Sequence, residues 1–317
     1  MRKYHFAITG FVLILFLIKT DAQTPDSAKR FLERGKKSFA EGNLQAAFED
    51  YSRAIEISSR LDSRKKTSAV ELNGAGEFNS PSPRPDITVI DPFTAIAYLS
   101  RGVVRYRQHF YDDAISDFNA AIRISPRLAE AYVGRGFVYR VKGDLDRASA
   151  DFDRAIAINP RLAEAYTDRA DVRIEKGNLD GALKDIEHSL AIKASSAETH
   201  SLLGYVRILK NEYDLAIASF DYALGLNPQL ASAYHGRGNA RMLRGQFKLA
   251  IADFTRALEL NPDSTFVYMN RGLALILQGN DAQAEKDFER CLELDPGLNS
   301  ELSRRIALAK QIRVPQP

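Results

Sequence analysis

The feature that most constrains this fold is internal repetition with a period of 34 residues. Seven copies can be aligned, the last six without a gap, at residues 28–61, 95–128, 129–162, 163–196, 197–230, 231–264 and 265–298. The rest of the 317-residue chain is split among residues 1–27, 62–94 and 299–317, none of them long enough for a separate enzyme domain. Because one short repeat cannot bury its apolar side alone, the copies are expected to stack into one elongated array.

Each copy predicts a pair of helices. In the third copy, Tyr132, Gly136 and Tyr139 share one helical face, and Gly143 supplies a stop. A second face follows in the same copy, made of Leu145, Ala148, Phe152 and Ala155. Pro160 then breaks the second helix and starts the next unit.

Small and large residues recur at fixed places, as expected where two helices approach closely. The small places hold Gly35, Gly102, Gly136, Gly204, Gly238 and Gly272 on the first helix, with Ala170 in the fourth copy, and Ala47, Ala114, Ala148, Ala182, Ala216, Ala250 and Ala284 on the second. A neighbouring place on the second helix holds Tyr51, Phe118, Phe152, Ile186, Phe220, Phe254 and Phe288.

This order of an aromatic residue at the fourth place, Gly at the eighth, Ala at the twentieth, an aromatic residue at the twenty-fourth and Pro at the thirty-second resembles the tetratricopeptide repeat family. The resemblance covers about three quarters of the chain and implies an all-α fold, an α-solenoid of seven helix-turn-helix repeats. The first copy departs from the pattern with Ser59, and the fourth with Ile186 and Ala194. Residues 299–317 predict an amphipathic capping helix and tail, with Leu302, Ile306, Ala309 and Ile312 on one face.

Charged residues recur as well. An arginine on the first helix is followed sixteen residues later by an aspartate in six copies, pairing Arg34 with Asp50, Arg101 with Asp117, Arg135 with Asp151, Arg169 with Asp185, Arg237 with Asp253 and Arg271 with Asp287. The fifth copy lacks both members, with Leu203 and Ser219 in their places. Loss of both together predicts a partly buried ion pair between the two helices of a copy, with a structural role.

The eleventh place carries further arginines, Arg105, Arg173, Arg207 and Arg241. Two interpretations stay open for them: stems lying over apolar surface, or guanidinium groups that meet an acidic partner.

The amino terminus has the features of an export signal. Arg2 and Lys3 precede an apolar run from Phe6 to Ile18, and small residues around Ala22 suit cleavage. Residues 1–22 are therefore predicted to be a secretory signal peptide, with retention as a membrane anchor as the alternative. The single cysteine, Cys291, is expected to be a small buried core residue.

Residues 62–94 interrupt the array and are predicted to be disordered, since they gather Gly74, Gly76, Pro81, Pro83 and Pro85. A hinge, a crossing loop and a partner-binding element are all compatible with this segment.

The resemblance also implies where a ligand would lie. In tetratricopeptide proteins the first helices line a concave face, and certain places of each first helix usually contact the ligand. At those places this chain has the predicted partner-binding residues Phe137, Arg140, Val141, Ile174, Tyr205, Ile208, Leu209, His235, Asn239, Met242, Leu243 and Leu273. Packing against an adjacent copy or the tail is the alternative for some of them, particularly Leu209, Leu243 and Leu277. The basic clamp with which some members hold a carboxyl terminus is not supported, because Leu32, Lys36, Leu99 and Val103 occupy its places.

Other chemistry has little support in the sequence. Lys and Arg number 44 against 41 Asp and Glu, so the chain lacks the basic excess of a nucleic-acid binder. No catalytic motif, metal-ligand spacing or phosphate-binding loop is found, so no enzyme activity, metal or cofactor is expected. The function expected is that of an exported scaffold binding a protein or peptide in its concave groove. The alternative is a membrane-anchored accessory or regulatory subunit of an envelope assembly machine or enzyme.

Overall fold

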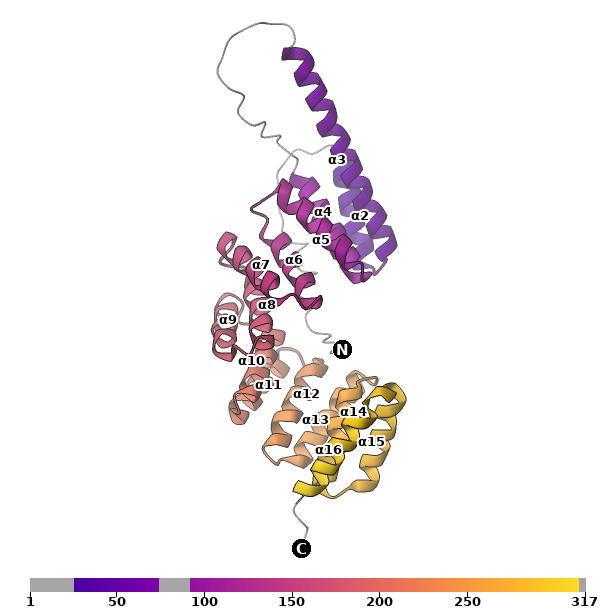
Figure 1. Cartoon of the computed structure of the whole chain (residues 1–317), viewed down its shortest axis with the longest axis vertical. Helices are drawn as coiled ribbons and strands as arrows, with labels where there is room; N and C mark the ends of the chain where they lie inside the picture. Colours follow the sequence, from indigo (N-terminus) through magenta and orange to yellow (C-terminus); the bar gives the residue numbers. More distant parts are fainter. Residues whose placement is uncertain (1–25, 74–91, 314–317) are drawn as a thin grey trace. The chain divides into compact units, whose positions relative to one another are not determined.

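The computed structural model describes residues 26–73 and 92–313, and the predicted signal peptide, residues 1–22, lies outside these ranges. Within them the secondary structure is entirely helical. Among the same residues, no helix combines the length and the apolar character needed to cross a bilayer. The fold class is therefore the predicted one, all-α and built from repeated helix-turn-helix units (Figure 1).

The helices alternate between a first and a second helix of each copy. The first helices are α2 (Asp26–Ala40), α4 (Pro92–Arg107), α6 (Ala129–Val141), α8 (Ala163–Glu175), α10 (Ala197–Leu209), α12 (Ala231–Leu243) and α14 (Thr265–Gln278). The second helices are α3 (Leu44–Asn73), α5 (Tyr111–Ile124), α7 (Leu145–Ile158), α9 (Leu179–Ile192), α11 (Tyr213–Leu226), α13 (Phe247–Leu260) and α15 (Asp281–Leu294). A short 3₁₀ turn, η1 (Pro296–Leu298), precedes α16 (Asn299–Ile312), which occupies the segment predicted to cap the array. The chain divides into two compact units, residues 1–172 and 173–317.

A left-handed residue ends the first helices. Gly143 has a φ of 81° and Gly245 a φ of 75°, a conformation that costs glycine little. Two copies use other residues at this place, with His109 at 66° and Asn211 at 61°. These places locate the turn between the two helices of a copy.

The insert begins later than predicted. Helix α3 continues through residues 62–73, well past the end of α2 (Figure 1), and α4 already starts at Pro92. The first copy has Ser59 where a proline would end the helix, and no glycine or proline follows until Gly74. Residues 62–73 are therefore helical, residues 92–94 belong to α4, and residues 74–91 of the predicted disordered segment lie outside the described residues.

Aromatic rings of the second helices fill the space left by small residues on the first. In the second unit, Phe220 is enclosed between Gly204 of its own copy and Gly236 of the next. A Cβ atom added to Gly236 would lie 2.3 Å from Cζ of Phe220, so only glycine allows this approach. Cys291 is buried within the core of the second unit, as predicted.

The predicted arginine–aspartate pairs are present within both units. Nη2 of Arg101 lies 2.7 Å from Oδ1 of Asp117, and the same two atoms are 2.7 Å apart in the Arg135–Asp151 and Arg237–Asp253 pairs. Pairs also form between Arg34 and Asp50 and between Arg271 and Asp287. Each of these aspartates is buried. The pair of the fourth copy, Arg169 with Asp185, would join residues of the two units and stays a prediction.

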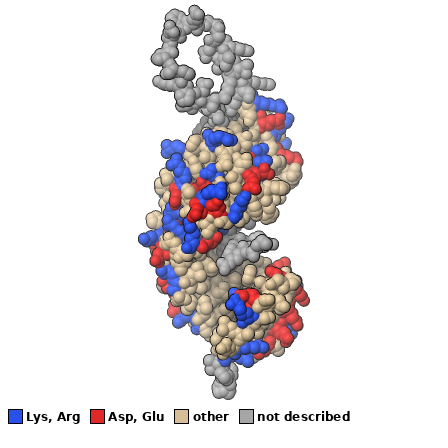
Figure 2. Space-filling view, in the orientation of Figure 1, with Lys and Arg blue, Asp and Glu red and all other residues tan. Residues whose placement is uncertain are grey.

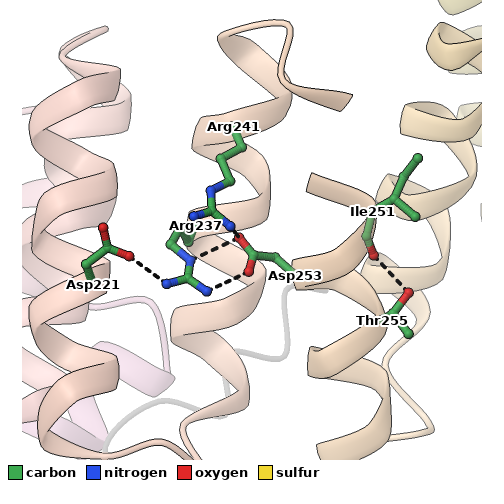
Figure 3. A network of polar contacts seen from close by, with 6 residues as sticks. All are labelled: Asp221, Arg237, Arg241, Ile251, Asp253 and Thr255. Atoms are coloured by element: carbon green, nitrogen blue, oxygen red, sulfur yellow. Dashed lines mark hydrogen bonds and ion pairs between the residues drawn. The ribbon is translucent and has the colours of Figure 1, made fainter. Parts of the chain in front are cut away.

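Arginines at the eleventh place form ion pairs with the same buried aspartates. Nη1 of Arg241 lies 2.6 Å from Oδ2 of Asp253, which also receives Arg237 (Figure 3). Arg105 reaches Asp117 at 2.7 Å in the same way. Two guanidinium groups four residues apart on a first helix thus neutralise one buried carboxylate of the second. The charged ends of these arginines are engaged within the repeat, which neither interpretation of the sequence had anticipated.

The fifth copy replaces the pair with a neutral contact. Arg207 donates to Oγ of Ser219 at 2.7 Å and to the backbone oxygen of Leu215 at 3.0 Å. Since Ser219 needs no counter-charge, the absence of the partner arginine at position 203 leaves no buried charge unpaired.

The first-helix arginine also contacts the preceding copy. Nη1 of Arg237 lies 2.6 Å from Oδ1 of Asp221 on α11, while its other nitrogens hold Asp253 on α13 (Figure 3). Arg135 contacts Asn119 and Arg271 contacts Thr255 at the equivalent place. Each such arginine therefore fixes the spacing of three helices.

Removal of a shared carboxylate is expected to be costly. Asp253→Ala leaves Arg237 and Arg241 mostly buried without their common partner, so the free energy of unfolding should fall by roughly 3–5 kcal/mol. Asp263→Ala removes an exposed partner of Arg290 and should cost less than about 1 kcal/mol. Urea unfolding followed by circular dichroism measures both variants, and equal losses would contradict a structural role for the buried pair.

Candidate functional site

In the second unit, large apolar side chains are exposed on the first helices. Tyr205 and Leu209 on α10 are 38% and 40% exposed, and Leu243 on α12 is 51% exposed. Helices α10 and α12 lie next to each other, so the three side chains belong to one surface. We call this surface, together with the facing part of α14, the α10–α12–α14 surface. An exposed apolar group of this kind is typical of an interaction site.

A polar network lies on the same surface. Nδ2 of Asn270 on α14 is 2.9 Å from Nε2 of His235 and donates a hydrogen bond of 2.9 Å to Oδ1 of Asn239, both on α12. Burial lowers the pKa of His235 to about 4, so at neutral pH the ring is uncharged and Nε2 can accept the hydrogen bond. Sequence analysis predicted His235 and Asn239 but missed Asn270, the side chain that joins them.

The remaining residues predicted for the second unit are less accessible. Ile208 and Met242 are half-buried against the repeat core, and Ile174 is half-buried on α8. Leu273 was predicted to contact a partner but is only 7% exposed. It packs in one cluster with Leu302 and Ala309, so the capping helix α16 covers the face of α14 that an external ligand would need. Leu273 is therefore covered by the protein's own capping helix, and the proposed packing of Leu277 against the tail agrees with its place in that cluster.

The first unit carries a different arrangement. The guanidinium of Arg140 lies 5.2 Å from the ring centre of Phe137, and Tyr106 of α4 meets the same ring edge-on at 5.2 Å. Phe137 is consequently buried rather than open to a ligand, while Val141 at the end of α6 is exposed. Arg140 also forms an ion pair of 2.7 Å with Asp171 on α8.

Asp168 is the residue of this region that sequence analysis missed. It lies one turn before Asp171 on α8 and is 7% exposed. Among the described residues, its carboxylate accepts no hydrogen bond and forms no ion pair. The sequence holds a signal for it, since the same place is Gly134 in the preceding copy and Leu202 in the following one.

The electrostatic state of Asp168 follows from its burial. Loss of solvent raises the pKa of Asp168 to about 7, with Arg140 opposing the rise and Asp171 and Glu164 adding to it. Burial also raises the pKa of Asp171, which its contact with Arg140 partly offsets. A carboxylate that titrates near neutral pH and lacks a partner is a candidate for a functional group.

Burial of Asp168 predicts an unusual pH dependence of stability. Because its folded pKa lies above the unfolded value, the charge destabilises the fold as pH rises from about 4 to 7, and the loss is complete above pH 7. Asp168→Asn should therefore raise the free energy of unfolding at pH 8 by up to about 4 kcal/mol, a gain that shrinks towards pH 4. Asp112→Asn, at a side chain that is 88% exposed, should change it by less than about 1 kcal/mol at either pH. Urea unfolding of both variants at pH 8 and pH 4 measures these changes. An unchanged free energy of unfolding for Asp168→Asn at pH 8 would contradict an ionised, unpaired carboxylate.

Metal-ligating and charged side chains are spread out in the described residues. In the part of the chain that the structure describes, no group of three His, Cys, Asp or Glu side chains is placed to hold a metal ion. Basic and acidic side chains are interspersed over the face shown in Figure 2, without a continuous basic surface for a phosphate backbone.

Comparison with known proteins agrees with the repeat geometry. Two family models, each described as a tetratricopeptide repeat, match the chain: one at residues 231–264 and 266–298, the other at 99–163, 133–197 and 167–231. Together the matched residues cover more than half of the chain. The chain belongs to the tetratricopeptide repeat family. The helix pair of residues 28–61 precedes these matches, yet it carries the same features, with Gly35 against Tyr51 and Arg34 paired with Asp50.

Solved structures with the same fold come from distant relatives. A tetratricopeptide repeat protein from Parabacteroides merdae is 18% identical, with a TM-score of 0.61 over 90% of this chain and 99% of that one. A chain of the APC/C hetero-tetramer Cut9–Hcn1 has a TM-score of 0.64 at 17% identity, over 94% of this chain and 58% of that one. PilF of Pseudomonas aeruginosa is 15% identical, with a TM-score of 0.59 over 68% of this chain and 97% of that one. At these identities the likeness extends to the fold alone. No curated protein sequence matches the chain.

Proposed function

We propose that this tetratricopeptide repeat protein is a non-catalytic scaffold that binds an extended segment of a partner protein on the α10–α12–α14 surface. The observation that carries the proposal is the exposure of Tyr205, Leu209 and Leu243 on neighbouring first helices, next to a pair of asparagines. Apolar anchors beside a few fixed polar groups are the usual composition of a peptide-binding surface.

The asparagines supply what a peptide backbone needs. Nδ2 of Asn270 is used twice within the network, whereas Oδ1 of Asn270 and Nδ2 of Asn239 have no hydrogen-bond partner among the described residues. One free acceptor and one free donor complement the N–H and C=O groups of an extended chain. The surface therefore offers backbone recognition between its apolar side chains.

The extent of the surface is limited on one side. Helix α16 covers Leu273 and its neighbours on α14, so the partner segment lies over α10 and α12 and reaches α14 only at Asn270.

Export is part of the proposal and is supported by the amino-terminal sequence, in which Arg2 and Lys3 precede the apolar run Phe6–Ile18. Mass spectrometry of the protein purified from its native cells should give a chain that begins after residue 22. An intact amino terminus would instead favour the membrane-anchored accessory subunit.

Loss of one apolar anchor should reduce partner binding. Cross-linking and capture from the native compartment with the full chain as bait identifies a partner, whose affinity for purified variants is then measured by fluorescence anisotropy. Leu243→Asp places a charge in the contact, and the dissociation constant should rise at least about tenfold. Leu215→Asp is the matched control, because Leu215 is equally exposed but lies on the second helix α11.

The control is expected to leave binding within about twofold of the wild type. A partner that is lost with Leu215→Asp and kept with Leu243→Asp would place the interaction on the second helices and contradict the proposal.

A further inference from the structure

Asp168 differs from every other buried aspartate of the described chain. The six others, Asp50, Asp117, Asp151, Asp185, Asp253 and Asp287, each pair with at least one arginine. Asp168 is equally buried, with 7% of its surface exposed, but has no such partner. A buried carboxylate is normally paired, so the position lacks one cation.

The cation that acts on Asp168, Arg140, is already engaged. Arg140 forms its ion pair with Asp171 and lies over the face of Phe137. Asp171 and Glu164 both act electrostatically on Asp168, and Arg140 acts on Asp168 as well as on Asp171. The region therefore has a local excess of negative charge and attracts a further cation.

An aromatic residue completes the surroundings. Tyr106 lies close enough to Asp168 for the carboxylate to act on its hydroxyl group, and its ring is held edge-on against Phe137. A carboxylate beside an aromatic ring is a combination that holds ammonium groups, through an ion pair and cation–π attraction. All these residues lie on the first helices α4, α6 and α8, within the part of the chain that forms the first unit.

We propose that Asp168, with Tyr106 beside it, binds the ammonium group of a lysine side chain from a partner protein. An ammonium is a compact charge on a slender stem, which suits a carboxylate of which little is exposed. A guanidinium needs a broad planar approach to both oxygens, and Arg140 already lies against Phe137. This site lies in the other unit from the α10–α12–α14 surface, so it goes beyond the proposed function.

Binding at this site is coupled to protonation. The charged and titratable groups that face Asp168 are Tyr106 on α4, Arg140 on α6, and Glu164 and Asp171 on α8. Because the pKa of Asp168 is about 7, part of the population is protonated at neutral pH, and an ammonium binds only the ionised form. Binding should therefore weaken as pH falls from 8 to 6.

The experiment uses the full chain and a fluorescein-labelled peptide of eight lysines as the probe, followed by fluorescence anisotropy at low salt. Asp168→Asn keeps the shape of the side chain and should raise the dissociation constant at least about tenfold at pH 8. Asp112→Asn removes the same charge from an exposed position of the same unit and should raise it less than about twofold. A peptide of eight arginines tests the choice of cation, and urea unfolding verifies that both variants are folded.

A loss of affinity for the lysine peptide that is confined to Asp168→Asn, and that grows as pH rises from 6 to 8, supports the site. Equal effects of the two variants would show general charge attraction and overturn it. Tighter binding of the arginine peptide, lost in Asp168→Asn, would overturn the assignment to lysine. Leu243→Asp, in the other unit, should leave binding of the lysine peptide unchanged, so failure here is distinguishable from failure of the proposed function.

Discussion

The ion pair between the two helices of a repeat is the constraint on which the remaining structure depends. A carboxylate buried on a second helix is costly without a counter-charge, so the first helix can lie only where its arginine reaches that carboxylate. The same guanidinium contacts the preceding repeat, as Arg237 does with Asp221, which sets the position of one repeat against the next. Rings such as Phe220, enclosed by Gly204 and Gly236, tolerate almost no displacement of these helices. Side chains on the outer faces of the first helices are thereby held in fixed relative positions, which a binding surface requires.

Features that repeat could be predicted from the sequence, because each copy is an independent test of the same contact. The joint loss of arginine and aspartate in the fifth copy was enough to predict the pair. The eleventh-place arginines could not be assigned in this way. Their spacing from the aspartate is twelve residues, and only the helix-to-helix approach shows that Arg237 and Arg241 reach one carboxylate together. The extension of α3 was missed because the disordered segment was predicted from glycine and proline residues that begin only at Gly74. Residues 62–73 contain neither and continue the helix.

Prediction of the binding surface was limited by what covers each residue. Family contact places identify a face of the first helices on which Leu243 and Tyr205 are exposed. They do not show that α16 returns to cover Leu273, because that contact depends on where the tail packs and not on the repeat. They also leave out Asn270 and Asp168, which occupy the sixth place of their copies. Neither residue repeats, so periodicity gives no indication of them, and non-repeating polar residues on a repetitive scaffold are where partner specificity is expected.

Asp168 and Asp253 show two uses of one chemical group in one fold. Asp253 has two arginines, and its charge stabilises the contact between helices. Asp168 has neither, and its charge lowers the stability of the folded chain at neutral pH. An asparagine there would keep the shape of the side chain and remove the cost, so packing does not explain an aspartate at this position. A cation supplied by a partner does explain it, because the ion pair would be completed only in the complex. Pairing would remove the free-energy cost of the buried charge, and this would favour binding of the partner.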